Sequence, residues 1–325
     1  MNAFVTGATG FVGAHLVQAL LARGDVVTCL VRSPAKAAAL AWPPAVRLVR
    51  GDLNDRAALA AGCAEADVVF HVAGQLAGRD LDHFLAANRD GTARVLEAAG
   101  TAARPPRRFV YVSSLAAGGS TVPGHPIDES RPPAPVTDYG RSKLAGETLV
   151  RAAPFPWTIV RPPVVYGEWD RELVRVFRFA RRGVAPVIGD GTQELSVIYA
   201  GDLAAALIAA ATATATAGHL YYAAHPSTIT SYGFVDAVGR AVGRRPLIVR
   251  LPGPLARGAL WIVGSLASLA GRDTLLTADK ANEFLAPAWT CSSEALSRDA
   301  GWRAVTDLES GLARTAAWYR TEGWV

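Results

Sequence analysis

Tyr139 and Lys143 lie four residues apart in a segment whose pattern predicts a helix. Side chains at this spacing project from one face of a helix, so a phenol and an ammonium can act on one ligand there. A tyrosine with its ordinary pKa of about 10 is a poor base at neutral pH, but a neighbouring ammonium stabilises the phenolate and lowers that pKa. The pair therefore predicts proton transfer to or from an oxygen atom.

Two hydroxyl groups, those of Ser113 and Ser114, follow the run 109–112, which predicts a strand. A serine at that strand end could hold a carbonyl or hydroxyl oxygen of a substrate near the tyrosine. The proline- and glycine-rich segment 115–137 predicts a long loop, and such loops are usually functional. Tyrosine and lysine also occur four apart on solvent-exposed helices, so the weight of the motif depends on the elements that position it.

The start of the chain predicts an element that would bring a cofactor to these groups. The apolar run 3–5 leads into glycines at positions 7, 10 and 13, and apolar residues then recur at helical spacing up to position 24. Strand, glycine turn and helix in this order predict a dinucleotide site, because a pyrophosphate can approach the helix N-terminus. An ordinary glycine turn is the alternative. The expected cofactor contacts are Gly7, Thr9, Gly10, Phe11, Val12 and Gly13.

Strand and helix patterns alternate through the first half of the chain. Strands are predicted at 25–31, 46–49, 67–71, 109–112 and 157–161, and helices at 55–61, ended by Gly62, and at 82–99. This alternation predicts an α/β fold with a Rossmann-type, doubly wound parallel sheet.

The second half predicts a smaller, mostly helical substrate-binding lobe. One further strand, 219–222, is expected to return to the sheet. We therefore assign residues 1–165 to the NADP-binding domain, with 197–223 returning to it, and residues 166–196 and 224–325 to the lobe.

The end of the second predicted strand indicates which dinucleotide binds. In this architecture an acidic residue there favours NAD, whereas an arginine accommodates the 2′-phosphate of NADP. Arg32 stands at this position with Lys36 near enough to assist, so NADP is expected and NAD is the weaker expectation. A solvated arginine that merely ends a strand is the alternative. At the end of the fourth strand, Val72, Ala73 and Gly74 are small enough to let a cofactor lie against the backbone.

Composition narrows the classes of protein. The 325 residues are 50% hydrophobic, which is ample for a core. Three scattered cysteines and six histidines lack the spacing of a disulfide framework or a metal site, so no metal is expected. The basic residues come as scattered pairs, not as a stripe with aromatic residues, so nucleic acid is not an expected partner despite a net charge of +5.

The chain begins almost directly with its first predicted strand, which leaves no room for a secretory or transit segment and predicts a cytoplasmic protein. The longest apolar stretch, 255–270, is interrupted by Arg257 and is shorter than the ~20 residues that span a bilayer, so no membrane span is expected. We interpret this stretch as a packed helix beside an apolar substrate pocket. Contact with a membrane surface is the open alternative.

The sequence resembles the extended short-chain dehydrogenase/reductase family of the NAD(P)-dependent epimerase/dehydratase type. Its pattern is closest to dihydroflavonol reductase and 3β-hydroxysteroid dehydrogenase-like members. The matching positions are 6–13, 51–53, 71–73, Asn88, 111–114, Tyr139 with Lys143, and 161–167, followed by 189–191, 199–203 and parts of 311–319. The resemblance implies that Ser114, Tyr139 and Lys143 are catalytic, and it favours Ser114 over Ser113.

The same resemblance implies further contacts. Asp52 and Leu53 would lie at the adenine, Pro162 and Val165 near the nicotinamide, and Asn88 among the cofactor-binding residues. It also implies a possible homodimer formed through the helices that carry Asn88 and the catalytic tyrosine.

The implied function is an NADP(H)-dependent oxidoreductase that interconverts a ketone and a secondary alcohol on a small, bulky, apolar substrate. The alternatives are a nucleotide-sugar epimerase or dehydratase with bound NAD, and a non-catalytic cofactor-binding regulator. A regulator has no use for the serine, tyrosine and lysine. Leu115 and Ala116 stand where dehydratases of the family carry acids. Pro162 with Pro163, and Leu195, replace the asparagine and the arginine that relatives use to hold a nucleotide sugar.

Overall fold

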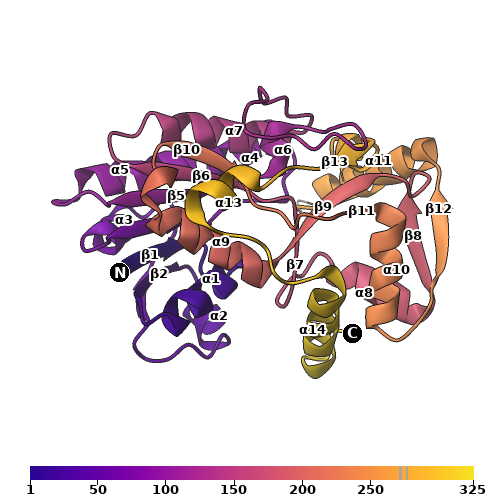
Figure 1. The fold of residues 1–325 in the computed structure, drawn as a ribbon, viewed down its shortest axis with the longest axis horizontal. Coiled ribbons are helices and arrows are strands. Elements are labelled where there is room, and N and C mark those ends of the chain that lie inside the picture. The colour runs from indigo at the N-terminus through magenta and orange to yellow at the C-terminus, as the bar shows by residue number, and fades with distance from the viewer. Residues whose placement is uncertain (271–272, 276) are drawn as a thin grey trace.

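Seven parallel strands form the central sheet, in the order β10-β6-β5-β4-β1-β2-β3. The structure is a computed structural model that describes residues 1–270, 273–275 and 277–325. The strands are β1 (Asn2–Thr6), β2 (Val26–Val31), β3 (Arg47–Arg50), β4 (Val68–His71), β5 (Arg108–Val112), β6 (Trp157–Arg161) and β10 (His219–Tyr222). The strand order reverses between β1 and β4, and ligands of doubly wound sheets bind at the carboxyl ends of the strands beside this point. The predicted α/β fold is confirmed (Figure 1).

Helices cover both faces of the sheet, and its central strands β1, β4 and β5 are accordingly almost entirely buried. Ala3 and Val5 of β1 pack in one cluster with residues of α1 (Phe11–Ala22) and α9 (Ala200–Thr212). Phe4, between them, points to the opposite face and packs with residues of α3 (Arg56–Cys63), α5 (Gly91–Thr101) and α7 (Asp138–Arg151). Successive residues of one strand thus supply two cores.

Gly62 does not end α3, which continues to Cys63, so that expectation is wrong. A Cβ atom built on Gly62 would lie 2.2 Å from the ring of Phe4. The glycine is needed because the helix packs closely on β1.

Two other segments differ from their predicted form. The helix expected at 82–99 consists of α4 (Leu81–Leu85), the π-helical turn η1 (Ala86–Asp90) and α5. Such a turn inserts an extra residue and often marks a functional site. The segment predicted as a loop from residue 115 begins with the short helix α6 (Leu115–Gly118).

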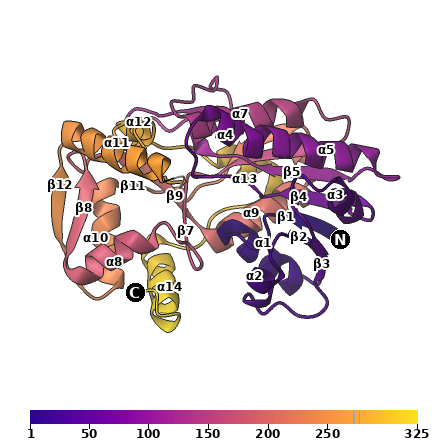
Figure 2. The same ribbon diagram turned by 180° about the vertical axis from the view of Figure 1, so that it is seen from behind.

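A second group of elements follows β6. Strands β7 (Val164–Tyr166), β9 (Glu194–Tyr199), β11 (Thr228–Thr230) and β13 (Ala288–Trp289) form one sheet, and β8 (Val184–Ile188) pairs with β12 (Leu247–Leu251). Helices α8 (Val174–Arg182), α10 (Ser231–Ala241) and α14 (Leu308–Thr321) enclose a separate apolar cluster. Helices predominate here as expected, but these strands were not predicted from the sequence. Figures 1 and 2 show this group beside the central sheet.

The apolar stretch 255–270 forms α11 (Gly253–Leu269), but the interpretation as a packed helix is wrong. Ala256 and Leu260 are buried, whereas Trp261, Leu266 and Leu269 are 62%, 61% and 86% exposed. The helix lies at the periphery of the molecule, as Figure 2 shows. No helix within the described residues is long and apolar enough to cross a membrane.

Candidate active site

The glycine turn joins the end of β1 to the start of α1 at the switch point. Gly7 has a φ of +73°, and a Cβ atom there would lie 2.6 Å from the backbone nitrogen of Ala73. A Cβ atom on Gly13 would lie 2.1 Å from the carbonyl oxygen of Gly7. The turn and the end of β4 are therefore packed backbone to backbone, with no space for side chains at these two glycines.

The N-terminus of α1 faces this turn. Gly10 is the N-cap residue of the helix, and no side chain caps it. The first N–H groups of a helix lack partners within the helix and favour an anion. Thr9, Phe11 and Val12 are half-buried around Gly10, which is exposed. These residues fit the pyrophosphate of a dinucleotide, as the sequence predicts.

A surface pocket of about 380 Å³ lies where β2 and β3 end. Arg32, Arg50, Gly51, Asp52 and Asp55 line it. Both carboxylates in this pocket accept hydrogen bonds from backbone N–H groups. Asp52 accepts from Asn54 at 2.7 Å, and Asp55 accepts from Ala58 at 3.0 Å. Both arginine side chains are exposed. The pocket thus offers two guanidinium groups to an anion at the position predicted for the adenosine ribose.

Sequence reasoning identified only one of these arginines. Arg50 was missed because the third strand was predicted to end at residue 49, and the structure extends it to 50. Lys36 lies on α2 (Pro34–Ala38), where its side chain is exposed and does not line the pocket. Leu53 packs against α5, since a Cβ atom on Gly91 would lie 2.8 Å from its Cδ1.

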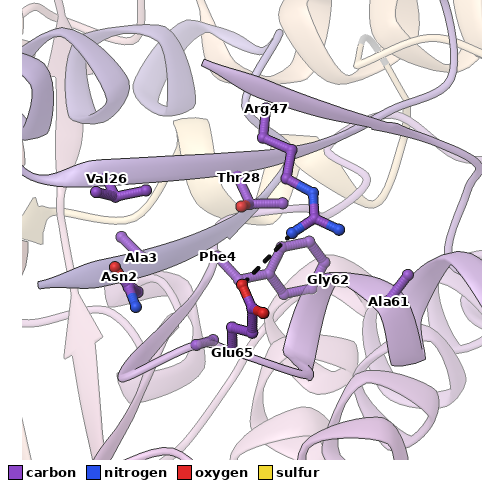
Figure 3. A pocket seen from close by; sticks show the side chains of 10 residues that line it. Asn2, Ala3, Phe4, Val26, Thr28, Arg47, Ala61, Gly62 and Glu65 are labelled. Carbon is purple, nitrogen blue, oxygen red and sulfur yellow. Dashed lines mark ion pairs between the residues drawn. The ribbon is translucent and has the colours of Figure 1, made fainter. Parts of the chain in front are cut away.

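A second pocket, shown in Figure 3, lies at the opposite edge of the sheet. Its lining includes Asn2, Val26 and Arg47, the first residues of β1, β2 and β3. Its volume is about 70 Å³, far below the ~300 Å³ of a small ligand site. Arg47 and Glu65 at its rim form an exposed ion pair of 3.6 Å. This pocket is not the active site.

Ser114 and Tyr139 meet beyond the carboxyl end of β5. The Oγ atom of Ser114 accepts from the backbone N–H of Ala116 at 3.1 Å and so caps α6. Tyr139 lies in the first turn of α7, which is capped by Thr137. The Ser114 hydroxyl acts on the phenol of Tyr139 and partly lowers its pKa, so the two side chains lie near one another.

The phenol of Tyr139 is protonated at neutral pH. Burial raises its pKa above the ordinary value, and the nearby Ser114 hydroxyl opposes that rise only in part. The ring packs edge-on against Phe84 of α4, with centroids 6.0 Å apart. A protonated phenol in this position is suited to donate a proton to a carbonyl oxygen.

Lys143 is buried one helical turn beyond the tyrosine. Its Nζ donates to the carbonyl oxygen of Val112, the last residue of β5, at 2.6 Å, and lies 4.4 Å from the ring centroid of Tyr111. Burial lowers the pKa of Lys143 to about 7, against an opposing effect of Glu147. A Cβ atom on Gly74 would lie 3.5 Å from this Nζ. The Lys143 side chain is therefore next to the strand end where a cofactor is expected to lie against the backbone.

The expected effect of Lys143 on the tyrosine is not seen. The groups that shift the pKa of Tyr139 are its burial, Ser114 and Glu283. The ammonium is held instead by the carbonyl of Val112 at the end of β5.

Ser113 is committed to a buried ionic network. Its Oγ donates to Glu147 at 2.5 Å, and Glu147 accepts two further hydrogen bonds of 2.7 Å from Arg161. Arg161 also donates to the hydroxyl of Tyr222 at 2.8 Å. This geometry supports Ser114 over Ser113 as the serine that faces substrate. Glu147 and Arg161 were not predicted, although Glu147 follows Lys143 at helical spacing.

Asn88, expected among the cofactor contacts, holds protein elements together. Its side-chain amide is buried, donates to Gln75 O at 3.0 Å and to Ser142 Oγ at 2.9 Å, and accepts from Gln75 N at 2.8 Å. The loop after β4 is thereby fixed against α7. The π-helical turn η1 supplies this contact, which makes Asn88 a positioning residue for the helix that carries Tyr139.

The chain after β6 is fixed against α6. The carbonyl of Pro162 accepts from Leu115 N at 2.8 Å, and Pro162 is buried. Val165 is half-buried in β7 and packs on the cluster shared by α1 and α9. Their expected place near a nicotinamide stays a prediction.

A C-terminal segment lies over the tyrosine, which no sequence pattern predicted. Asp279 accepts from the backbone N–H of Asp138 at 2.9 Å. In α12 (Lys280–Phe284), Lys280 lies with its Nζ 5.7 Å from the ring centroid of Tyr139 and is paired with Glu283 at 2.7 Å. The surroundings of the tyrosine therefore include residues that are distant in the sequence.

Comparisons with known proteins agree with this geometry. The sequence model described as "NAD dependent epimerase/dehydratase family" matches residues 3–224. A ceramide reductase from Caulobacter vibrioides is 35% identical over 99% of this chain and 95% of its own length. A 3 beta-hydroxysteroid dehydrogenase/Delta 5-->4-isomerase from Mycobacterium tuberculosis is 30% identical over 80% of this chain and 73% of its own. The structure of MoeE5 with UDP-glucose and NAD aligns with a TM-score of 0.78 at 25% identity, covering 99% of both chains.

Proposed function

The chain belongs to the NAD dependent epimerase/dehydratase family, and we propose that within it the protein is an NADP(H)-dependent reductase of an apolar, lipid-like ketone. It is an NAD(P)-dependent oxidoreductase acting on CH–OH groups, as its reductase and dehydrogenase relatives are. The observation that supports the finer proposal is the proximity of Ser114 to the buried phenol of Tyr139, with Lys143 buried one helical turn further along α7.

The chemistry follows from the protonation states of these groups. The substrate oxygen accepts hydrogen bonds from Ser114 and Tyr139, and Tyr139 gives its phenolic proton to that oxygen as charge develops on it. A nicotinamide, when bound, supplies the hydride for reduction. Lys143, whose pKa burial lowers to about 7, exchanges protons at neutral pH one helical turn from the tyrosine. In the oxidative direction the same groups remove the proton.

The choice of NADP rests on Arg32 and Arg50. Both line the pocket at the ends of β2 and β3, where the ribose of a dinucleotide lies in this architecture. A hydrogen bond between ionised groups contributes ~1.5–3 kcal/mol, and two arginines can share one 2′-phosphate.

Two kinds of observation support an apolar substrate: the residues found at the candidate site and the names of two similar proteins. Leu115 and Ala116 are buried directly after Ser114, so no acid stands there to protonate a leaving group. Leu195 packs among apolar side chains of two clusters, where a sugar-nucleotide enzyme would need a cation for the diphosphate. The names of two relatives, a ceramide reductase and a hydroxysteroid dehydrogenase, indicate lipid substrates.

A substrate and cofactor matrix tests the proposal. Long-chain 3-keto lipids and 3-ketosteroids are each mixed with NADPH or NADH, and the nicotinamide absorbance is followed. We expect net oxidation of NADPH with at least one of these ketones and a slower rate with NADH. Isomerisation of UDP-glucose by the protein as purified, without added cofactor, would contradict the proposal and favour the epimerase alternative.

A further inference from the structure

Helix α11 carries an exposed apolar surface, which we call the α11 face. Its members are large apolar residues that are 41–86% exposed: Leu255, Trp261, Ile262, Val263, Leu266 and Leu269. Positions 255, 262, 266 and 269 follow helical spacing and lie on one side of the helix. A contiguous exposed apolar patch of this kind marks an interaction surface.

The stretch of sequence that contains this face is strongly basic. Residues 241–272 include five arginines and no acidic residue. The whole chain has 33 basic and 28 acidic residues, so the remainder has 28 of each (33 − 5 = 28). The formal net charge of +5 is therefore that of this segment alone. The arginines are Arg244, Arg245, Arg250, Arg257 and Arg272.

We propose that the α11 face docks the protein on the surface of an anionic lipid bilayer. Helix α11 has an apolar face, one arginine (Arg257) and no acidic residue, and the arginines before it in the sequence add positive charge. This composition matches the chemistry of a helix lying in a membrane interface. The helix does not span a membrane, in keeping with surface binding. The same charge disfavours a second copy as the occupant, because a symmetric pair would bring two basic segments together.

The chain that follows the α11 face returns to the candidate active site. Shortly after α11, Asp273 lies 3.9 Å from Arg79 and 3.4 Å from His83 of α4. Asp279 then contacts Asp138, the neighbour of Tyr139. Figure 2 places α11, α12 and α4 along one edge of the molecule. A docked protein would thus take a lipid ketone directly from the bilayer, a consequence that rests on the proposed function.

Vesicle sedimentation of the full chain tests the docking. The probes are vesicles of phosphatidylcholine alone and of phosphatidylcholine with phosphatidylglycerol. We expect cosedimentation with the anionic vesicles that weakens as salt rises. The double variant Leu266→Ser with Leu269→Ser should bind about a hundredfold more weakly, since each lost leucine lowers partitioning about tenfold. Val305→Ser, a control at a residue 84% exposed outside the α11 face, should bind as the unmodified protein does.

Two results would overturn the proposal. One is equal sedimentation of the double variant and the unmodified protein, or sedimentation of neither with anionic vesicles. The other is self-association of the unmodified protein that the double variant abolishes, which would make the face a contact between copies. Reduction of a short, water-soluble ketone should be unchanged in the double variant. Absence of that reaction in the unmodified protein would refute the proposed function while leaving the vesicle result to decide the docking.

Discussion

At the scale of single residues, the proposed proton transfer depends on the protonation states of Tyr139 and Lys143. Tyr139 keeps its proton because burial raises its pKa, whereas Lys143 loses its proton easily because burial lowers its pKa to about 7. Spacing predicted that Tyr139 and Lys143 share one face of a helix, and the end of a predicted strand gave the position of Ser114. Spacing could not predict that Lys143 donates to Val112, because that contact depends on the packing of α7 against β5.

Replacing Tyr139 with phenylalanine removes the proton and keeps the ring that packs on Phe84. The rate of ketone reduction should fall by ~10²- to 10⁴-fold. Binding of NADPH, followed by fluorescence titration, should stay within a few-fold. Substantial activity in the variant would assign the proton donor to another group.

The depressed pKa of Lys143 predicts a pH dependence of stability. Between its folded pKa of about 7 and the ordinary value of 10.5, the unfolded chain binds more protons at this lysine than the folded chain does. The free energy of unfolding contributed by this group therefore rises with pH across that window. We expect the unmodified protein to gain stability relative to Lys143→Met from pH 7 to pH 10 in urea denaturation. A constant difference between the two proteins would show that the lysine is not desolvated.

Arg32 and Arg50 should determine the preference for NADPH. Replacing either with alanine should lower the ratio of NADPH to NADH affinity by roughly tenfold or more, the value of one charge-assisted hydrogen bond. Arg47→Ala is the matched control, because Arg47 begins the strand that Arg50 ends and lies at the other edge of the sheet. The assignment would be refuted if Arg47→Ala lowered the ratio of NADPH to NADH affinity, or if neither the Arg32 nor the Arg50 variant lowered it.

At the scale of elements, alternating strand and helix patterns predicted the sheet because apolar strands covered on both faces leave a strong signal. The glycine turn could also be predicted from the sequence, because Gly7 and Gly13 make close backbone contacts that a side chain would prevent. Short strands such as β11 and β13, and the π-helical turn that carries Asn88, were not predicted. A strand of two or three residues is too short to show a periodic pattern, and its formation depends on pairing with residues distant in the sequence. The five-residue π-helical turn lies within one helical pattern, which does not distinguish it from the helices on either side.

The close contact of α3 with β1 can be tested by adding one methyl group. Gly62→Ala should destabilise the fold by ~1–3 kcal/mol, because its Cβ would lie 2.2 Å from the ring of Phe4. Gly258→Ala, in α11, meets no atom within 4 Å and should be neutral or stabilising by up to ~1 kcal/mol. Thermal unfolding of both variants gives the comparison, and equal melting temperatures would contradict the packing argument.

At the scale of the whole molecule, three features lie next to one another along one side (Figure 2). They are the carboxyl end of the central sheet, the segment over Tyr139 and the α11 face. The exposure of α11 was not predictable, because an apolar helix has the same sequence signal whether a core or a surface receives it. The structure distinguishes the two through Leu266 and Leu269, which are more than half exposed.

The most direct test of the central claim follows the hydride itself. The protein is incubated with NADPH deuterated at the reactive position of the nicotinamide and with a 3-keto lipid, and the product is examined by mass spectrometry. We predict one deuterium at the new carbinol carbon of the alcohol for each NADPH oxidised, and none with Tyr139→Phe on the same timescale. An unlabelled product, or a UDP-sugar isomerised with no NADPH consumed, would contradict the assignment as a ketone reductase.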